Sequence, residues 1–328
     1  MHQVNKDNLI FKRVSLAPMA GITDVVLRNL VREHSKTCLL TTEMISSEGL
    51  KHVHDCAIIK KNDNDSPIAF QLSGHKPELM AQAAKFLESR TDIIDINMGC
   101  PVKKVVVGGD GSALMKTPEL AQDIVRAIKE VVNIPVSVKF RLGYTADTMN
   151  YVAFGEMMQE AGADFITIHA RTRAQMYAGV ADWAKIKDLK KSVDVPVFAN
   201  GDVVSIETAE KCLELSGADG VAIGRGVLGD VTLPYRIEHF LETGERLAPP
   251  TIEDKLDALT RHLEGEIELR GTDVGIKCIR KLYGYYIAGI RNAAKYRAEL
   301  VRIEDYGEMI RALEKIRQEV RQSAQLEV

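Results

Sequence analysis

A cysteine stands where a buried strand gives way to a long loop. The apolar run 93–96 indicates a strand that ends in Asn97 and Cys100, and Pro101 then prevents further regular pairing. The residues alone leave two interpretations open. Cys100 is either a chemically active thiol at the edge of a loop or a half-buried thiol that packs as a small hydrophobe.

The chain that follows this cysteine predicts a lid or a binding loop. Thr117 has the position of a helix N-cap, with a proline in the first turn and an acid placed against the helix dipole. Residues 102–116 therefore connect the strand to this helix, and they include the glycine-rich run 108–111. A connection of that length inside a compact fold usually covers or binds something.

Short apolar runs alternate with amphipathic stretches along most of the chain. The eight predicted strands are 14–17, 39–43, 68–72, 93–97, 136–141, 165–169, 197–200 and 220–223. Eight near-equal strands separated by helices favour a TIM (β/α)8 barrel over the rival open, doubly wound sheet. We expect this α/β barrel to occupy residues 1–243 and to be the catalytic domain.

The predicted strands end in residues that could form a site. These residues are the run 18–21, Gln71, Asn97, Cys100, Lys139, Arg141, His169, Arg171, the run 200–202 and the run 224–226. In a barrel the carboxyl ends of all strands meet at one mouth, where sites are built. Polar groups are costly to bury unpaired, so their repetition at the strand ends predicts a binding site there.

The last two strands end in a pattern typical of phosphate binding. Residues 200–202 (Asn-Gly-Asp) and 224–226 (Gly-Arg-Gly) place glycines where backbone N–H groups can approach a phosphate closely. Arg225 can add a charge-assisted pair. Ordinary turns are the alternative.

Two cations alternate along the fifth predicted strand. Lys139 and Arg141 share one face because alternate residues of a strand point the same way. A lysine inside a barrel requires an anion, a Schiff base or a flavin. A buried ion pair with Asp95 or Glu43 is the alternative.

The sixth predicted strand ends in a histidine followed by a basic loop. A lone histidine such as His169 is more often a core residue than a catalyst. Arg171, Arg173 and Gln175 follow it, however, and are typical of an anion or nucleic-acid contact.

The tail predicts a second, all-helical domain at 252–328, joined to the barrel by a turn-rich linker at 244–251. We expect its helices at about 252–270, 273–288, 291–299 and 305–321. Residues 251–273 hold seven acids and three bases, whereas residues 274–302 hold seven bases and one acid. These bases are interleaved with Tyr283, Tyr285, Tyr286 and Tyr296. Bases with tyrosines predict an RNA surface, and a solvated helix face is the alternative.

Composition narrows the class of protein. The 328 residues carry a formal net charge of −3, so any nucleic-acid surface must be local. The five cysteines are an odd number without metal-binding spacing, which predicts no disulfide, no structural zinc and a reducing cytoplasm. The polar first 12 residues are unlike a signal peptide, and no apolar run approaches the roughly 20 residues of a membrane helix. We therefore expect a soluble cytoplasmic protein.

Taken together, the strand ends resemble one family of RNA-modifying enzymes. The matching stretches are 17–24 (Ala-Pro-Met-Ala-Gly-Ile-Thr-Asp), 71–74 (Gln-Leu-Ser-Gly), 97–101 (Asn-Met-Gly-Cys-Pro), 139–143 (Lys-Phe-Arg-Leu-Gly), 169–172 (His-Ala-Arg-Thr), 200–202 and 224–226. In this order, over nearly the whole barrel, they resemble the tRNA-dihydrouridine synthases. The resemblance implies an FMN enzyme that reduces the C5–C6 double bond of selected uridines in tRNA, with NADPH or NADH as reductant.

The resemblance also implies roles, position by position. Flavin contacts are expected from Pro18, Met19, Ala20, Gln71, Lys139, His169, Asn200, Gly201, Asp202, Gly224 and Arg225. Asn97 and Arg141 are expected to read the uracil, and Cys100 to be the general acid that gives a proton to C5. The other predicted substrate contacts are Arg171 and the tail bases Lys277, Arg280 and Lys281. We expect no metal and a monomer.

Two residues depart from the family's usual pattern. Ala170 stands where glycine is usual and Tyr144 where tryptophan is common, which bears on substrate selection more than on activity. Other interpretations are a flavin barrel for free pyrimidines of the dihydroorotate dehydrogenase type and an aldolase that uses Lys139 as a Schiff base. The same chemistry on ribosomal RNA and a non-catalytic RNA-binding barrel are further alternatives.

Overall fold

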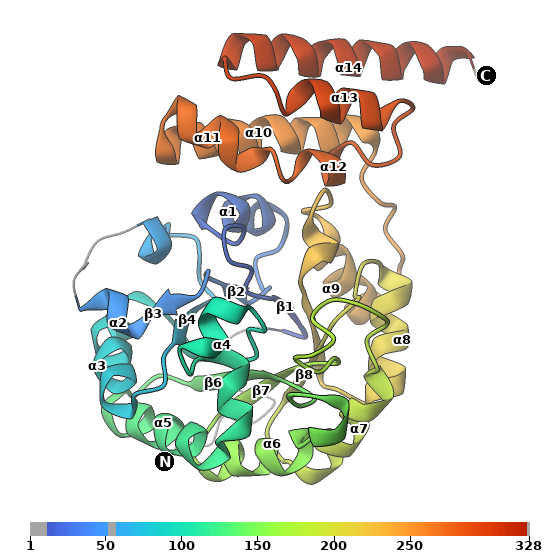
Figure 1. The fold of residues 1–328 in the computed structure, drawn as a ribbon. Coiled ribbons are helices and arrows are strands. Elements are labelled where there is room, and N and C mark those ends of the chain that lie inside the picture. Colours follow the sequence, from blue (N-terminus) through green and yellow to red (C-terminus); the bar gives the residue numbers. More distant parts are fainter. Residues whose placement is uncertain (1–11, 52–56, 327–328) are drawn as a thin grey trace.

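The computed structural model describes residues 12–51 and 57–326, which form a closed parallel barrel with a layer of helices beside it (Figure 1). The strands are β1 (Val14–Leu16), β2 (Leu40–Thr41), β3 (Ile45–Ser46), β4 (Ile68–Ser73), β5 (Ile93–Met98), β6 (Val136–Arg141), β7 (Phe165–His169), β8 (Val197–Asn200) and β9 (Gly220–Ile223). They pair in parallel in the order β1-β9-β8-β7-β6-β5-β4-β2, and a bridge from Ser15 to Leu39 joins the two ends of that order. The predicted (β/α)8 barrel is confirmed.

The strand predicted at 39–43 is wrong in its extent. Only β2 forms there, and the chain pairs with β4 a second time through β3. The Thr42 hydroxyl accepts a hydrogen bond from the N–H of Gln71 at 3.1 Å and donates to the carbonyl of Glu43 at 2.8 Å. This side chain takes the place of a backbone acceptor, so the regular ladder stops at Thr42.

Helices pack around the outside of the strands. They are α1 (Val25–His34), α2 (Ser47–Leu50), α3 (Pro77–Leu87), α5 (Pro118–Val131), α6 (Tyr151–Glu160), α7 (Trp183–Ser192), α8 (Ile206–Ser216) and α9 (Leu233–Thr243). Strand residues alternate between these helices and the barrel interior. On β6, Phe140 packs against Phe154 of α6 with ring centroids 5.1 Å apart, while Lys139 and Arg141 line the interior.

The barrel interior is layered. An apolar cluster fills it at the amino ends of the strands, and its members are Leu39, Ala69, Ile93, Phe165 and Phe198. Two positions farther along the strands the inward side chains become polar, as in Gln71, Asp95 and Asn200. The costly polar groups are thus gathered at the mouth, where they can bind one another or a ligand.

The connection after Cys100 is not an irregular loop. It contains helix α4 (Lys103–Val107) and a 3₁₀ segment at Gly111–Lys116. Helix α5 then begins at Pro118 with Thr117 at its N-cap, as predicted, although the Thr117 side chain makes no capping hydrogen bond. The connection is therefore a folded cover over one side of the mouth.

The tail forms α10 (Ile252–Arg270), α11 (Thr272–Ile279), α12 (Tyr283–Tyr286), α13 (Ala293–Leu300) and α14 (Tyr306–Leu326). We call residues 252–326 the helical region. The single helix predicted at 273–288 is wrong, because the chain leaves the helix at residues 280–282, between α11 and α12. Helix α12 then ends at Tyr286, before Gly289, whose φ is 89°. The domain limits 1–243, 244–251 and 252–328 stay a prediction, with residues 1–11 and 327–328 outside the described residues.

No helix in the described ranges combines the length and the hydropathy needed to cross a bilayer. Four of the five cysteines are free, and Cys56 lies outside the described residues.

Asp24 of the barrel lies beside three side chains of the helical region, and we call Asp24, His262, Glu266 and Arg270 the interface cluster. The Arg270 guanidinium contacts Asp24 Oδ2 and Glu266 Oε2, each at 2.7 Å. Asp24 also caps α1, because its other oxygen accepts from the first N–H groups of that helix. Backbones approach closely beside the cluster, since a Cβ added at Gly265 would lie 2.5 Å from the Val26 side chain.

The two carboxyl groups of the interface cluster have pKa values that are shifted in opposite directions. Burial and the neighbouring Asp24 carboxylate raise the pKa of Glu266 to about 7, although Arg270 opposes the rise. Burial also disfavours ionisation of Asp24, but hydrogen bonds with Glu266 and Arg270 outweigh it and lower the Asp24 pKa. An unfolded glutamate has a pKa of about 4.3. The free energy of unfolding should therefore fall as the pH rises from there to neutrality, because only the folded state keeps the Glu266 proton.

Glu266→Gln should remove this pH dependence, because glutamine keeps the hydrogen bonds and cannot ionise. Between about pH 5 and about pH 8, the wild-type protein should lose more unfolding free energy than the variant, by on the order of 2 kcal/mol. Urea denaturation at the two pH values measures the difference. The same loss in both proteins would show that Glu266 does not hold the proton.

Candidate active site

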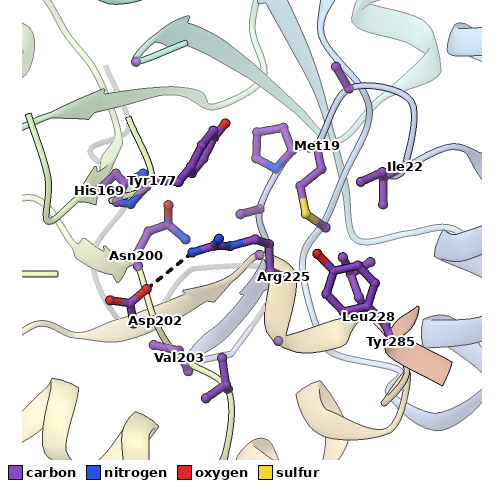
Figure 2. A pocket seen from close by; sticks show the side chains of 18 of the residues that line it. Met19, Ile22, His169, Tyr177, Asn200, Asp202, Val203, Arg225, Leu228 and Tyr285 are labelled. Carbon is purple, nitrogen blue, oxygen red and sulfur yellow. Dashed lines mark ion pairs between the residues drawn. The ribbon is translucent and has the colours of Figure 1, made fainter. Parts of the chain in front are cut away.

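The predicted residues at the strand ends line one cavity of about 910 Å³ (Figure 2). Its barrel wall includes Pro18, Met19, Ala20, Gln71, Asn97, Cys100, Lys139, Arg141, His169, Arg171, Asn200, Gly201, Asp202, Gly224 and Arg225. Lys281, Leu282 and Tyr285 of the helical region contribute the facing wall. The cavity thus brings together every barrel residue that was predicted to bind the flavin or the uracil, and Cys100 with them.

A chain of hydrogen bonds runs across the inside of β4, β5 and β6. The buried carboxylate of Asp95 accepts from the Ser137 hydroxyl and the Gln71 amide, both at 2.6 Å. The Gln71 carbonyl oxygen accepts from the Asn97 amide at 2.7 Å. Burial raises the pKa of Asp95 to about 6, although the Ser137 and Gln71 hydrogen bonds oppose the rise. Gln71 and Asn97 are therefore oriented before any ligand enters.

Asn97 also fixes the backbone that carries Cys100. Its Oδ1 accepts from the N–H of Gly99 at 3.2 Å and from the N–H of Cys100 at 2.9 Å. The Cys100 carbonyl accepts from the Ser112 hydroxyl at 2.9 Å. The folded connection of residues 102–116 therefore also holds the Cys100 backbone. The thiol thus has a set place at the edge of the cavity.

The thiol of Cys100 stays protonated at neutral pH. Its half-burial raises the pKa above the usual value for cysteine, although a Val102 hydrogen bond and the cations Arg141 and Lys139 oppose the shift. A protonated thiol is a poor nucleophile but can give up a proton. The environment therefore suits a proton donor.

Lys139 is a half-buried cation whose hydrogen-bond partner is an amide. Its ammonium group donates to Asn200 Oδ1 at 2.9 Å. Asp95 is engaged by other side chains and Glu43 accepts from the N–H of Gly21, so the predicted alternative of an ion pair with either acid is not what the structure shows. Desolvation and the nearby Arg141 lower the pKa of Lys139 to about 8. Such a cation suits an anionic ligand.

Two further basic residues complete this side of the cavity. Burial lowers the pKa of His169 well below its usual value, and the charges of Arg141 and Lys139 add to the effect, so the imidazole is neutral. The Arg141 guanidinium donates to the carbonyls of Gly99 and Met176, each at 2.8 Å. Arg141 therefore ties the Cys100 backbone to the loop after β7.

Arg171 does not lie on a surface that RNA could touch. It is 2% exposed, and its guanidinium contacts Asp202 at 2.6 Å. Arg225 approaches the other oxygen of Asp202 at 3.6 Å and remains half exposed (Figure 2). Asp202 is thus neutralised from two sides, and Arg225 is the freer of the two arginines to meet an incoming anion.

Tyr177 belongs to the site and was missed. Its ring lies 5.5 Å from the Arg141 guanidinium and 5.4 Å from that of Arg225, and Figure 2 shows it beside His169. The sequence held a weak signal, an aromatic residue six positions after Arg171 in a basic loop. Half exposed at the mouth, Tyr177 can contact a planar ligand.

Comparison with known proteins now identifies the group to which this site belongs. The family model for dihydrouridine synthase (Dus) matches residues 15–325. The chain belongs to the dihydrouridine synthase family. A probable tRNA-dihydrouridine synthase of Rickettsia conorii is 40% identical over 298 residues, which cover 89% of each chain. The tRNA-dihydrouridine synthase B of Pseudomonas aeruginosa is 36% identical over 303 residues, again 89% of each chain. The family predicted from the strand ends is confirmed.

Solved structures support the fold of this family member. Histamine dehydrogenase from Rhizobium sp. 4-9 aligns with a TM-score of 0.52 and 15% identity, covering 76% of this chain and 48% of that one. A variant of NCR from Zymomonas mobilis aligns with a TM-score of 0.50 and 17% identity, covering 74% and 90%. Identities this low show the barrel fold alone.

The tyrosines predicted to stack on RNA are mostly internal. Tyr283, Tyr286 and Tyr296 are buried, whereas Tyr285 is 42% exposed and lines the cavity. Their aromatic rings were read as surface groups, but they form the core of the helical region. Of the four, Tyr285 alone is placed to touch a ligand.

The three tail bases predicted to bind RNA have different environments. Lys281 lines the cavity and donates to the carbonyl of Gly21. Arg280 is half buried and pairs with Glu304 at 3.2 Å. Lys277 is exposed on α11. Their roles stay a prediction, and Lys277 is the simplest of the three to test.

The protonated state of Cys100 predicts its reactivity in this dihydrouridine synthase family member. Alkylation of Cys100 by iodoacetamide should be slow at about pH 7 and should accelerate past about pH 9, because only the thiolate reacts. Mass spectrometry of the modified peptide follows Cys100 apart from the other cysteines, and Cys100→Ala is the control. Rapid alkylation that is already complete at neutral pH would contradict the raised pKa.

Proposed function

We propose that the protein uses flavin mononucleotide to reduce the C5–C6 double bond of specific uridines in tRNA, with NADPH or NADH as the source of electrons. The observation that carries this proposal is the place of Cys100, a protonated thiol held by Asn97 at the edge of a cavity lined with cations. Family membership and the names of the curated relatives support the choice of reaction and substrate.

The cavity fits flavin mononucleotide in size and in charge. Its volume of about 910 Å³ lies within the usual range of small-molecule sites, about 300–1,000 Å³. Lys139 offers a positive charge that suits the N1–O2 edge of a reduced flavin. Gly201 has a φ of 117° and, with Gly224 and Arg225, suits the phosphate end. Bound flavin would supply the hydride that is added to C6 of the uracil.

Cys100 would complete the reduction by giving its proton to C5. The double bond between C5 and C6 becomes a single bond as each carbon gains one C–H bond. The thiolate then regains a proton from solvent. Asn97 and Arg141 keep the thiol in place through the backbone of residues 99–100. They also lie where they can read the uracil edge, as predicted. The neutral imidazole of His169 adds a hydrogen-bonding group without adding charge.

The substrate is a base that has left its stack. A stacked uridine cannot reach a cavity inside a barrel mouth, so the RNA must present it extruded. The names of the relatives favour tRNA over ribosomal RNA. Family membership also favours this proposal over a Schiff-base aldolase built on Lys139. The monomeric state, the cytoplasmic location and the absence of a metal stay predictions.

Cys100→Ala should keep bound flavin and RNA affinity but should lower the rate of dihydrouridine formation by about 10²- to 10⁴-fold, the usual contribution of a general acid. Mass spectrometry of unmodified tRNA after incubation measures the product, and the visible spectrum measures the flavin. Cys278→Ala, a half-buried thiol in the helical region, is the matched control and should stay active. Equal rates in the wild-type protein and Cys100→Ala would remove Cys100 from the mechanism.

Lys277→Glu should weaken RNA binding and flatten its dependence on salt, because fewer counterions are released when one phosphate contact is lost. Lys191→Glu is the control, since Lys191 is exposed in the last turn of α7, at the barrel end opposite the mouth. Titration of fluorescent tRNA at several salt concentrations gives the salt dependence of binding for each variant. If the two variants bind alike, the RNA surface lies elsewhere.

A further inference from the structure

The loop between β1 and α1 is shared by the cavity and the interface with the helical region. Ala17, Pro18, Met19 and Ala20 line the cavity. Asp24, at the other end of the loop, lies in the interface cluster. One short loop therefore joins the proposed flavin site to the interface cluster.

Hydrogen bonds make this loop a single stiff unit. The carbonyl of Met19 accepts from the N–H groups of Ile22 and Thr23, both at 3.0 Å, and the Met19 N–H donates to the Thr23 hydroxyl at 3.1 Å. The carbonyl of Thr23 in turn accepts from Arg28 at 2.9 Å. Thr23 is hydrogen-bonded to Met19 and directly precedes Asp24 in the chain. A shift of Asp24 must therefore move Met19 as well.

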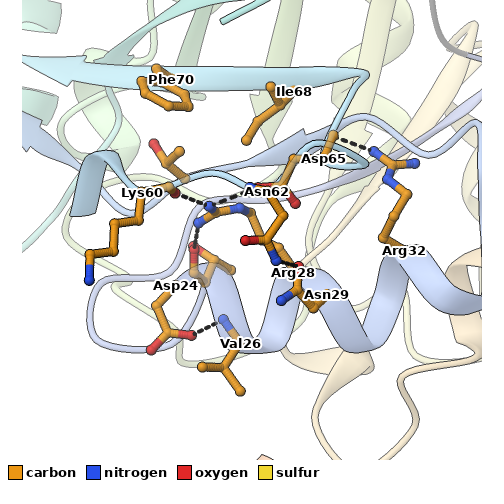
Figure 3. A network of polar contacts seen from close by, with 12 residues as sticks. Asp24, Val26, Arg28, Asn29, Arg32, Lys60, Asn62, Asp65, Ile68 and Phe70 are labelled. Atoms are coloured by element: carbon orange, nitrogen blue, oxygen red, sulfur yellow. Dashed lines mark hydrogen bonds and ion pairs between the residues drawn. The ribbon is translucent and has the colours of Figure 1, made fainter. Parts of the chain in front are cut away.

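The barrel holds the loop from one side. Arg28 of α1 is fully buried, and besides Thr23 it contacts the carbonyl of Lys60 at 2.7 Å and Asp65 at 3.3 Å (Figure 3). The helical region holds the loop from the other side. Arg270 pairs with Asp24, and Lys281 donates to the carbonyl of Gly21.

The interface cluster has the composition of a metal site but is already neutralised. Ligand atoms of Asp24, His262 and Glu266 lie within 4.8 Å of one another. The Arg270 guanidinium, however, makes a two-pronged contact with both carboxyl groups at 2.7 Å. His262 accepts from or donates to the Tyr286 hydroxyl at 2.9 Å, and burial lowers its pKa to about 4. Arg270 thus supplies the positive charge that a metal ion would bring.

We propose that Arg270 is a positioning residue: through Asp24 it sets the loop of residues 17–24, and with it the Pro18–Ala20 wall, against the bound flavin. The inference rests on the proposed flavin site. It assigns to the helical region a task besides contact with RNA, since α10 completes the cavity from outside the barrel. Tyr285 and Lys281 on the facing wall belong to the same docked region.

The test compares two arginines that each pair with more than one acid. Arg270 bridges the helical region and the barrel, whereas Arg317 of α14 pairs with Glu253 and Asp257 of α10, within the helical region, at 2.7 and 2.8 Å. Arg270→Met and Arg317→Met both delete an arginine that bridges separate carboxylates in the full-length protein. Flavin mononucleotide is titrated into each flavin-free variant by fluorescence quenching, and the thermal midpoint is recorded in parallel.

Arg270→Met should weaken flavin binding about tenfold and shift the visible flavin band, while Arg317→Met should change flavin affinity less than twofold even if it lowers the thermal midpoint as much. Asp24→Asn keeps the cap of α1, because asparagine caps as well as aspartate, and should follow Arg270→Met. If Arg270→Met does not fold, Asp24→Asn tests the same contact between Asp24 and Arg270. Glu266→Gln keeps both hydrogen bonds to Arg270 and Asp24 and should bind flavin as the wild-type protein does.

Equal flavin affinity in Arg270→Met, Asp24→Asn and Arg317→Met would overturn the proposal. The titration uses no RNA, so it separates this inference from the proposed reaction. A wild-type protein that binds flavin but forms no dihydrouridine would contradict the function and leave the flavin comparison standing.

Discussion

Uncompensated positive charge at the barrel mouth is the constraint on which the site depends. Strand β6 turns Lys139 and Arg141 inward at alternate positions, and they are held by an amide and by backbone carbonyls. Burying charge without a counter-ion is expensive, and the lowered pKa of Lys139 reports that cost. A bound anion would offset it. Strand β6 therefore places positive charge where an anionic ligand would be stabilised.

The same charge sets the protonation of its neighbours. Together with burial, the larger cause, it lowers the pKa of His169 and keeps the imidazole neutral. It opposes but does not overcome the effect of half-burial on the pKa of the Cys100 thiol. A thiolate beside two cations would be the usual expectation at an electropositive site. Here the effect of desolvation on the pKa is the larger one, because the folded connection packs against Cys100: a Cβ added at Gly111 would lie 3.0 Å from the Cys100 Cβ. The outcome is a protonated thiol, as the proposed role of Cys100 in the reduction requires.

The strand ends could be predicted from sequence because the signals are local. Alternation along each strand fixes which side chains face inward, and Gln71, Asn97, Lys139 and Asn200 all lie where that rule puts them. The interruption of the strand ladder at Thr42 was not predicted, because it arises from one hydroxyl that replaces a backbone acceptor. The basic loop after His169 suggested RNA contact, yet Arg171 turns inward to Asp202, 31 positions away.

Contacts between distant segments were beyond any local pattern. Asp24 and Arg270 are 246 positions apart, and nothing in either sequence neighbourhood indicates the other. Charge counts in the tail likewise could not separate bases that bind neighbouring groups, such as Arg280, from an exposed one such as Lys277. The aromatic residues of the tail were misjudged for the same reason, since burial depends on packing between helices.

The most direct measurement of the central claim is a map of dihydrouridine across total RNA from the source organism, with the gene present and with the gene deleted. The account predicts that dihydrouridine disappears from one or a few positions in tRNA, is unchanged in ribosomal RNA, and returns when the wild-type gene is restored but not when Cys100→Ala is. An unchanged map in the deletion strain, or full restoration by Cys100→Ala, would contradict it.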